Sequence, residues 1–207
     1  MEPLLRLAGG APVSWALLAL IVGISLLGLF AAPAVIERNV FRPYWLVPRR
    51  QYATLVTSAF IHADLAHLFF NAFTFWAFAF SLERQIGSAR FFALYAVGLL
   101  TSDAGTWFKH RQNPAYQTLG ASGAILAVLF ASIIYFPTAS LYILPIPVPI
   151  PAPLFAVSYV AYSYYASRRA IGRVNHDAHL SGALVGVAFV VLTDSQAVAR
   201  AWGSLFG

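Results

Sequence analysis

The chain has 207 residues and a net charge of +6; 60% of its residues are hydrophobic and only 10% are charged. Soluble domains carry about 25% charged residues, so this composition excludes an ordinary soluble enzyme and is typical of a membrane protein. The absence of cysteine excludes disulfide bonds, a thiol nucleophile and a thiolate metal site, and the basic residues lie in short loops, where they suit lipid headgroups better than nucleic acid.

Crossing a bilayer takes about 20 apolar residues. Six apolar segments meet this requirement, some of them narrowly: 13–36, 65–82, 91–108, 119–136, 154–166 and 178–193. The first is too long for the core of a signal peptide, and we expect it to remain in the protein. We therefore predict an all-α membrane protein, a bundle of six transmembrane helices forming a single integral membrane domain over residues 1–207.

Two connections have distinctive compositions. Residues 37–51 combine several arginines with Pro43, Trp45 and Pro48, which predicts a loop at the membrane interface. Residues 145–153 have proline at every second position, which excludes the interior of a helix and favours an extended strap leading into the fifth segment.

The second, fourth and sixth segments all enter the bilayer from the same side. Polar side chains gather at their starts: His62, His67, Asn71, Ser122, Asn175, His176, Asp177 and His179. Polar groups at membrane depth are costly and usually face the interior of a bundle or a wet cavity. We therefore expect these side chains to converge on one hydrated site.

Ser122 is the candidate nucleophile. It lies at the start of the fourth segment within Gly120-Ala-Ser-Gly, where the unpaired N–H groups of a helix favour developing negative charge. His179 is the candidate base, and Gly182 and Gly186 on the same segment have the small-xxx-small spacing that permits close helix packing.

His67 and Asn71 are four residues apart, so they project from one face of the second segment. Both carry donors that can stabilise an oxyanion, as does the N–H of Ser122.

Four motifs resemble those of the rhomboid intramembrane serine proteases. The resemblance covers a core of about residues 52–194 and rests on segments of the sequence in the family's order: His62-Ala-Asp-Leu-Ala-His67-Leu-Phe-Phe-Asn71, Glu83-Arg-Gln-Ile-Gly87-Ser88, Gly120-Ala-Ser122-Gly123 and Ala178-His179-Leu-Ser-Gly182-Ala-Leu-Val-Gly186. Each motif alone is weak, but the four together are specific. The resemblance implies a six-helix rhomboid-like bundle and substrates that are themselves transmembrane helices.

The resemblance also implies roles for individual residues. Ser122 and His179 are expected to form a catalytic dyad without a carboxylate, and no cofactor or metal is expected. The oxyanion and substrate-binding site is expected to use His67, Asn71 and the backbone at Gly120, Ala121 and Ser122. His62, Gly182 and Gly186 are expected to support the site.

Two positions depart from the family pattern. Leu126 stands where many bacterial members have a tyrosine that stacks on the base, and Gln51-Tyr52 stands where many have Trp-Arg. The first departure bears on how His179 is oriented, and the second on how the first loop is anchored.

Several other interpretations remain. The alternative function is that of a catalytically silent rhomboid-like protein that binds or escorts membrane proteins, although such proteins usually lack the serine or the histidine, and this chain has both. Asp177 is a candidate third member of a catalytic triad but is expected to point elsewhere, and His176 is expected to be a neighbour of the base. A zinc site or an aspartyl protease is disfavoured because the His-Glu-x-x-His pattern is absent and Asp103 has no convincing partner.

The predicted partners are transmembrane protein substrates and membrane lipid, with no nucleic acid, and the protein is expected to be a monomer. Most of the 13 Lys and Arg residues lie in the first, third and fifth connections, so the positive-inside rule places the active-site face in the cytoplasm. The resemblance implies the opposite, a multi-pass protein of the bacterial inner membrane whose site opens to the external or periplasmic face. We adopt the orientation that the resemblance implies.

Overall fold

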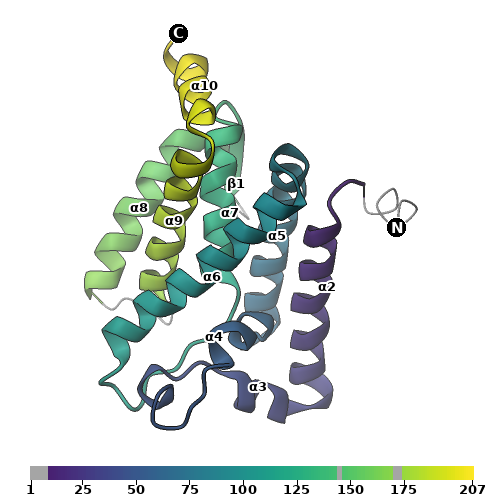
Figure 1. Ribbon diagram of the computed structural model, residues 1–207, viewed down its shortest axis with the longest axis vertical. Helices are drawn as coiled ribbons and strands as arrows, with labels where there is room; N and C mark the ends of the chain where they lie inside the picture. The colour runs from purple at the N-terminus through teal and green to yellow at the C-terminus, as the bar shows by residue number, and fades with distance from the viewer. Residues whose placement is uncertain (1–8, 144–145, 170–173) are drawn as a thin grey trace.

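The computed structural model describes residues 9–143, 146–169 and 174–207. They form a bundle of helices with one small hairpin (Figure 1). The helices are α2 (Pro12–Leu26), α3 (Pro33–Asn39), α4 (Thr54–Thr57), α5 (Leu65–Ile86), α6 (Ser88–His110), α7 (Ser122–Tyr135), α8 (Ala152–Arg169), α9 (His176–Thr193) and α10 (Ser195–Phe206). The prediction of an all-α rhomboid-like membrane bundle is confirmed.

Helix α7 is the centre of the bundle. Every residue from Gly123 to Ile133 is buried, and α7 packs against α5, α6 and α9. Figure 1 shows α8 and α9 on one side of it and α5 and α2 on the other. Because its run of Ala, Ile, Leu and Val is apolar on all sides, it suits a position surrounded by other helices. The first residue of α7, Ser122, is thereby held inside the bundle.

The prediction that residues 13–36 form one transmembrane helix is wrong at the C-terminal end of that segment. Helix α2 stops at Leu26, continues as a π-helical turn η1 (Leu27–Ala31), and is interrupted before α3. The interruption occurs at Pro33, which has no N–H to donate and whose ring clashes with the preceding helical turn.

The number of membrane crossings stays a prediction. Among the described residues, three helical stretches are long and apolar enough to cross a bilayer by length and composition: Pro12–Ala31, Leu65–Ile86 and His176–Thr193. Helix α7 is apolar but shorter.

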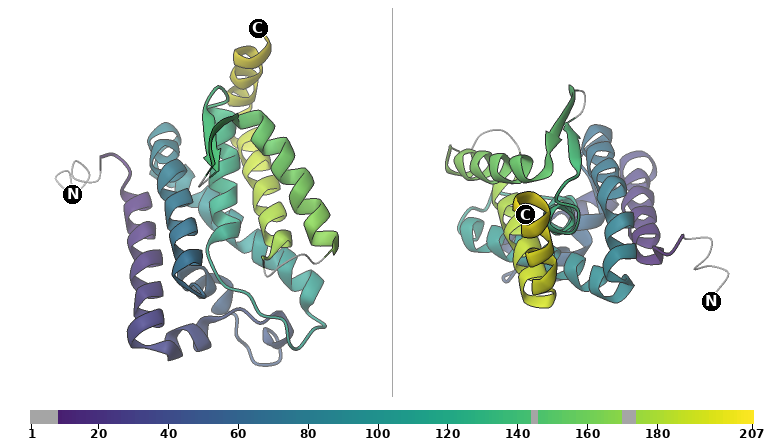
Figure 2. Two further views of the ribbon diagram at one scale, coloured as in Figure 1. Left: turned by 180° about the vertical axis from the view of Figure 1, so that it is seen from behind. Right: turned by 90° about the horizontal axis from the view of Figure 1, so that it is seen from above.

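The proline-rich segment is extended, as its composition predicts, but it also pairs with a neighbour. Strand β1 (Ser140–Ile143) runs antiparallel to β2 (Ile146–Pro151), with Leu141 opposite Ile150. Alternate positions of a strand direct their N–H groups to the same edge, so prolines at every second position remove donors from one edge only. The other edge remains able to pair, and Figure 2 shows the hairpin beside α7 and α8.

Glu83 fixes the end of α5 to α2. Glu83 is 1% exposed, and its carboxylate accepts hydrogen bonds from the N–H groups of Val13 (3.0 Å) and Ser14 (2.6 Å) and from the hydroxyl of Ser88 (2.6 Å). A carboxylate at the N-terminus of a helix satisfies donors that have no partner within that helix. Glu83 therefore anchors α2, α5 and the start of α6 to one another.

The tail after Asp194, for which the sequence predicts no element, forms α10. The side chain of Asp194 accepts a hydrogen bond from the N–H of Ala197 at 3.0 Å, which caps this helix.

Candidate active site

Ser122 and His179 are in direct contact. The Nε2 atom of His179, in the first turn of α9, lies 2.8 Å from the Oγ atom of Ser122, the first residue of α7. This distance is a normal hydrogen bond between a hydroxyl and an imidazole nitrogen. The pair has the geometry of a nucleophile with its adjacent base.

The position of His179 follows from the cap of its helix. Asn175 accepts a hydrogen bond from the N–H of Ala178 at 3.1 Å, and its side-chain amide donates to the hydroxyl of Thr106 on α6 at 2.9 Å. The cap starts α9 just before His179, and the bond to α6 fixes where that start lies.

Two glycines allow α9 to approach α7 closely enough for this contact. A Cβ atom on Gly182 would overlap the carbonyl oxygen of Gly123, and one on Gly186 would overlap the carbonyl oxygen of Ala127. The two backbones are therefore nearly in contact along this line, which is the use that small residues have between membrane helices.

Tyr159 of α8 contacts the other side of the imidazole. Its hydroxyl lies 2.9 Å from Nδ1 of His179. If Nε2 accepts the Ser122 proton, Nδ1 must carry a proton, which it donates to the oxygen of Tyr159. The hydroxyl of Tyr159 can accept this proton, so the contact is compatible with the tautomer that a base requires.

Sequence reasoning missed Tyr159. The family pattern places an aromatic partner of the histidine at position 126, which here is Leu126. Leu126 is 6% exposed and lies in the apolar cluster against which Tyr159 packs. The aromatic partner of His179 therefore comes from α8 in this chain. The only signal in the sequence was the group of tyrosines in the fifth segment, which did not indicate one of them.

His67 and Gly120 lie against each other next to Ser122. Gly120 has φ +109°, and a Cβ atom there would lie 2.8 Å from Cε1 of His67, so only glycine fits. The N–H of Gly120 donates to the carbonyl of Ser58 at 2.9 Å, while among the described residues no oxygen accepts from the N–H of Ser122. His67 therefore lies directly beside the turn that leads to Ser122.

Asn71 is buried at 8% exposure on the same helix as His67. Its amide nitrogen donates to the carbonyl oxygen of His67 at 3.0 Å. The structure therefore places Asn71 one turn from His67, with this donor engaged by its own helix.

His62 is fully buried behind His67. Its Nδ1 lies 2.8 Å from the hydroxyl of Ser25 on α2, and its ring centroid lies 4.8 Å from that of His67. Burial lowers the pKa of His62 to about 3, so the ring is neutral. It contacts His67 from the side of α2.

Asp177 points away from the dyad. Its carboxylate lies 2.8 Å from Nζ of Lys109 and also accepts from the hydroxyl of Ser167, so it joins α9 to α6 and α8. The ring of His176 lies 6.1 Å from that of His179, centroid to centroid. Within the described part of the chain, no carboxylate is hydrogen-bonded to His179.

The sequence is similar to known proteins of one family. A family model described as the Rhomboid domain matches residues 49–195. Rhomboid protein 1, a mitochondrial protein of Saccharomyces cerevisiae, is 28% identical over 175 residues, which are 81% of this chain and 50% of that protein.

Two further relatives come from a fish and a bacterium. Presenilin-associated rhomboid-like protein A, mitochondrial, of Danio rerio is 32% identical over 138 residues, 66% of this chain and 36% of that protein. Rhomboid protease GluP of Bacillus subtilis is 36% identical over 87 residues, 42% of this chain and 16% of that protein. The chain therefore spans half or less of the length of these curated relatives.

Proposed function

Because the chain belongs to the rhomboid family, we propose that it is an intramembrane serine endopeptidase that cleaves transmembrane helices near the membrane surface. The observation that carries this proposal is the 2.8 Å contact between Oγ of Ser122 and Nε2 of His179. Rhomboid-family proteins act on membrane proteins, and both groups that such a reaction needs are present here.

The proposed reaction begins with attack of Ser122 on the scissile carbonyl carbon. His179 accepts the hydroxyl proton as the C–O bond forms, and it then donates that proton to the amine leaving group as the C–N bond breaks. Water, deprotonated by the same imidazole, hydrolyses the resulting acyl-enzyme. No metal or cofactor takes part in these steps.

The tetrahedral intermediate carries a negative charge on its oxygen. The N–H of Ser122 and the imidazole of His67 are the proposed donors to this oxygen; the N–H has no acceptor among the described residues, and the imidazole lies against Gly120, two residues before Ser122. Donors held in place before the reaction stabilise such a charge without reorganising. Asn71 joins this set when its amide turns from the carbonyl of His67 towards the substrate.

The substrate helix must unwind before it is cut. Peptide bonds within a helix are shielded by their own hydrogen bonds, and in lipid these bonds are not given up without other partners. The polar groups around Ser122 supply such partners, and substrates with helix-breaking residues beyond the cut are expected to be preferred.

The membrane of residence stays a prediction: the bacterial inner membrane with an outward-facing site is expected from the resemblance, whereas the relatives include mitochondrial proteins.

The test is cleavage of a membrane-reconstituted substrate with a single transmembrane helix. Ser122→Ala is expected to abolish cleavage because it removes the nucleophile and little else. Ser132→Ala is the matched control, because it removes a buried hydroxyl from the same helix away from His179. Cleavage by a pure Ser122→Ala sample at the wild-type rate contradicts the proposal. A wild-type protein that binds the substrate but never cuts it favours the catalytically silent relative instead.

Tyr159 is proposed as a positioning residue for His179. Replacement Tyr159→Phe keeps the ring and removes the hydroxyl 2.9 Å from Nδ1. A hydrogen bond to a charged group contributes about 1.5–3 kcal/mol, so kcat is expected to fall about 10- to 100-fold as the imidazolium loses its partner. KM is expected to stay unchanged. Tyr165→Phe, at an exposed position of the same helix, is the control. A rise in KM at constant kcat would show that Tyr159 serves substrate binding and not the base.

A further inference from the structure

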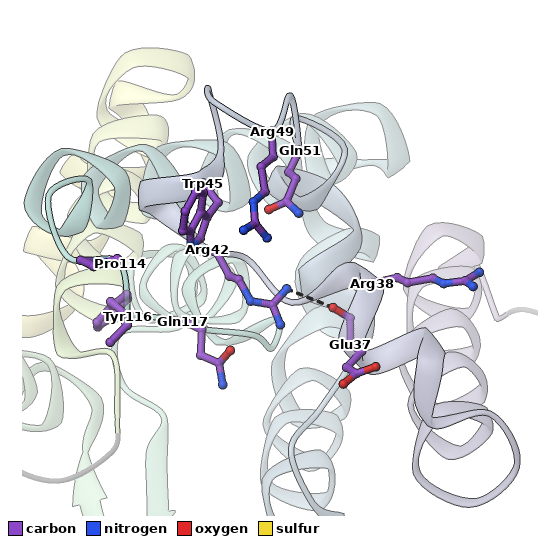
Figure 3. A pocket seen from close by; sticks show the side chains of 10 residues that line it. Glu37, Arg38, Arg42, Trp45, Arg49, Gln51, Pro114, Tyr116 and Gln117 are labelled. Atoms are coloured by element: carbon purple, nitrogen blue, oxygen red, sulfur yellow. Dashed lines mark hydrogen bonds between the residues drawn. The ribbon is translucent and has the colours of Figure 1, made fainter.

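A cavity of about 500 Å³ lies between the first loop and the segment that precedes α7 (Figure 3). Its walls come from the stretches 37–51 and 114–117. Its volume is within the range of cavities that hold small molecules, about 300–1,000 Å³. It contains neither Ser122 nor His179, and the proposed reaction does not use it.

Arginine and amide side chains converge on this cavity. Figure 3 shows the guanidinium groups of Arg42 and Arg49 facing the same space, with Gln51 and Gln117 at its edge and Arg38 extending away from it. Guanidinium groups present several N–H donors in a plane, which matches the oxygens of a phosphate.

Neither Arg42 nor Arg49 is paired with a carboxylate within the described residues. Arg42 donates to the backbone carbonyl of Glu37 at 3.1 Å, and Arg49 lies over the ring of Trp45 at 3.8 Å from its centroid. These contacts orient the two cations without neutralising them. The lining also contains one carboxylate, that of Glu37, so the two arginines that face the cavity leave an excess of positive charge, which favours an anion there.

Gln51 provides an independent observation. Its side-chain oxygen is buried and has no hydrogen-bond partner among the described residues. An unpaired buried polar atom is costly and usually marks a missing partner. Because the two ends of an amide have nearly the same shape, the group can turn its NH₂ towards an anion in the cavity.

The composition of the surface around the cavity favours a position at the membrane interface. Tyr44, Val47, Tyr52 and Val56 of the same loop region are large hydrophobic side chains exposed at the surface. Tyrosine and tryptophan are enriched at the level of lipid headgroups, and arginines there contact phosphates.

The cavity also touches the chain that leads to the nucleophile. Phe41, next to Arg42, exchanges two backbone hydrogen bonds of 2.9 Å with Thr118, four residues before Ser122. An anion bound by both walls would add a second connection between these segments.

We propose that this cavity binds the phosphate group of an anionic phospholipid, held by Arg42, Arg49 and Gln51. A free phosphate ion has the same chemistry and is the alternative source of the ligand. The lipid is favoured because the aromatic and apolar side chains beside the cavity suit the headgroup region.

The experiment measures which lipids remain bound to the protein released from vesicles, by native mass spectrometry. The vesicles contain equal amounts of phosphatidylglycerol and phosphatidylcholine, with or without an excess of inorganic phosphate. The wild-type protein is expected to retain phosphatidylglycerol over phosphatidylcholine by about tenfold, which corresponds to about 1.4 kcal/mol. Binding is measured without any cleavage, so the result does not depend on whether Ser122 is a nucleophile.

Two pairs of substitutions with the same change in charge separate this site from general attraction. Arg42→Gln with Arg49→Gln is expected to reduce the preference to within about twofold of none, whereas Arg84→Gln with Arg90→Gln, at the far end of α5 and the start of α6, keeps it. Arg42→Lys with Arg49→Lys keeps the charge and the fold but loses the planar donors, so an intermediate preference is expected.

The outcomes are distinct. Retained phosphatidylglycerol that inorganic phosphate does not displace supports the lipid as the source. Displacement by inorganic phosphate, with phosphate retained on its own, supports the same site with the free ion as ligand. No preference in the wild-type protein, or an unchanged preference in a folded Arg42→Gln, Arg49→Gln protein, overturns the proposal.

Discussion

Replacing His179 with alanine is expected to lower the cleavage rate by at least about 10⁴-fold, as does Ser122→Ala, because neither group works without the other. The imidazole is the only side chain that is hydrogen-bonded to the Ser122 hydroxyl among the described residues. Without it, the hydroxyl proton has no acceptor when the serine attacks. The rate is measured as product formed from a transmembrane substrate by mass spectrometry over long incubations.

The double variant gives the sharper result. Groups that act as a unit show strongly non-additive losses, so Ser122→Ala with His179→Ala is expected to be no slower than either single variant. His176→Ala is the control for the neighbouring imidazole, and its rate is expected to stay within about tenfold of wild type because its ring lies 6.1 Å from that of His179. If His176→Ala were as damaging as His179→Ala while the protein stayed folded, the assignment of the base would be wrong.

The second large effect is expected from one added methyl group. Gly182→Ala places a Cβ atom in overlap with the carbonyl oxygen of Gly123, the residue after the nucleophile. Helix α9 must then move away from α7, and His179 moves with it. A misplacement of about 1 Å can lower a rate about 10²-fold, and overpacking typically costs about 1–3 kcal/mol of stability. Both the cleavage rate and the thermal midpoint are therefore expected to fall.

Gly23→Ala is the matched control for this prediction. It is the same substitution in the apolar helix α2, where no heavy atom lies within 4 Å of the new Cβ. Alanine is the better helix former by about 1 kcal/mol, so stability and activity are expected to be unchanged or slightly higher. Equal effects of the two substitutions would show that the loss at Gly182 has nothing to do with the contact between α7 and α9.

The helices could be predicted because their apolar runs are long and end at polar residues. The predicted segments 65–82 and 178–193 lie within α5 (Leu65–Ile86) and α9 (His176–Thr193). The end of α2 was missed, although Pro33 was a visible signal, because the apolar composition continues past it. The pairing of β1 with β2 was missed because the prolines indicate an extended chain but not which segment pairs with it.

The candidate site could be predicted to the extent that its residues lie at helix starts. Because the fourth and sixth predicted segments enter the bilayer from the same side, Ser122 and His179 are expected on that side. The glycines indicate that the two helices approach each other. The contact between Tyr159 and His179 could not be predicted in this way, because it depends on how α8 is rotated against α9. The cavity at Arg42 and Arg49 depends similarly on the path of a loop that has no periodic pattern.

Reaction with a fluorophosphonate tests the central claim most directly, because this reagent forms a covalent bond only with a serine activated as a nucleophile. The adduct is located by mass spectrometry of the peptides from wild-type and His179→Ala protein in membranes. An adduct on Ser122 in the wild type, and none in His179→Ala, is the predicted result. An adduct on a different residue, or equal labelling of Ser122 without the imidazole, would contradict the account.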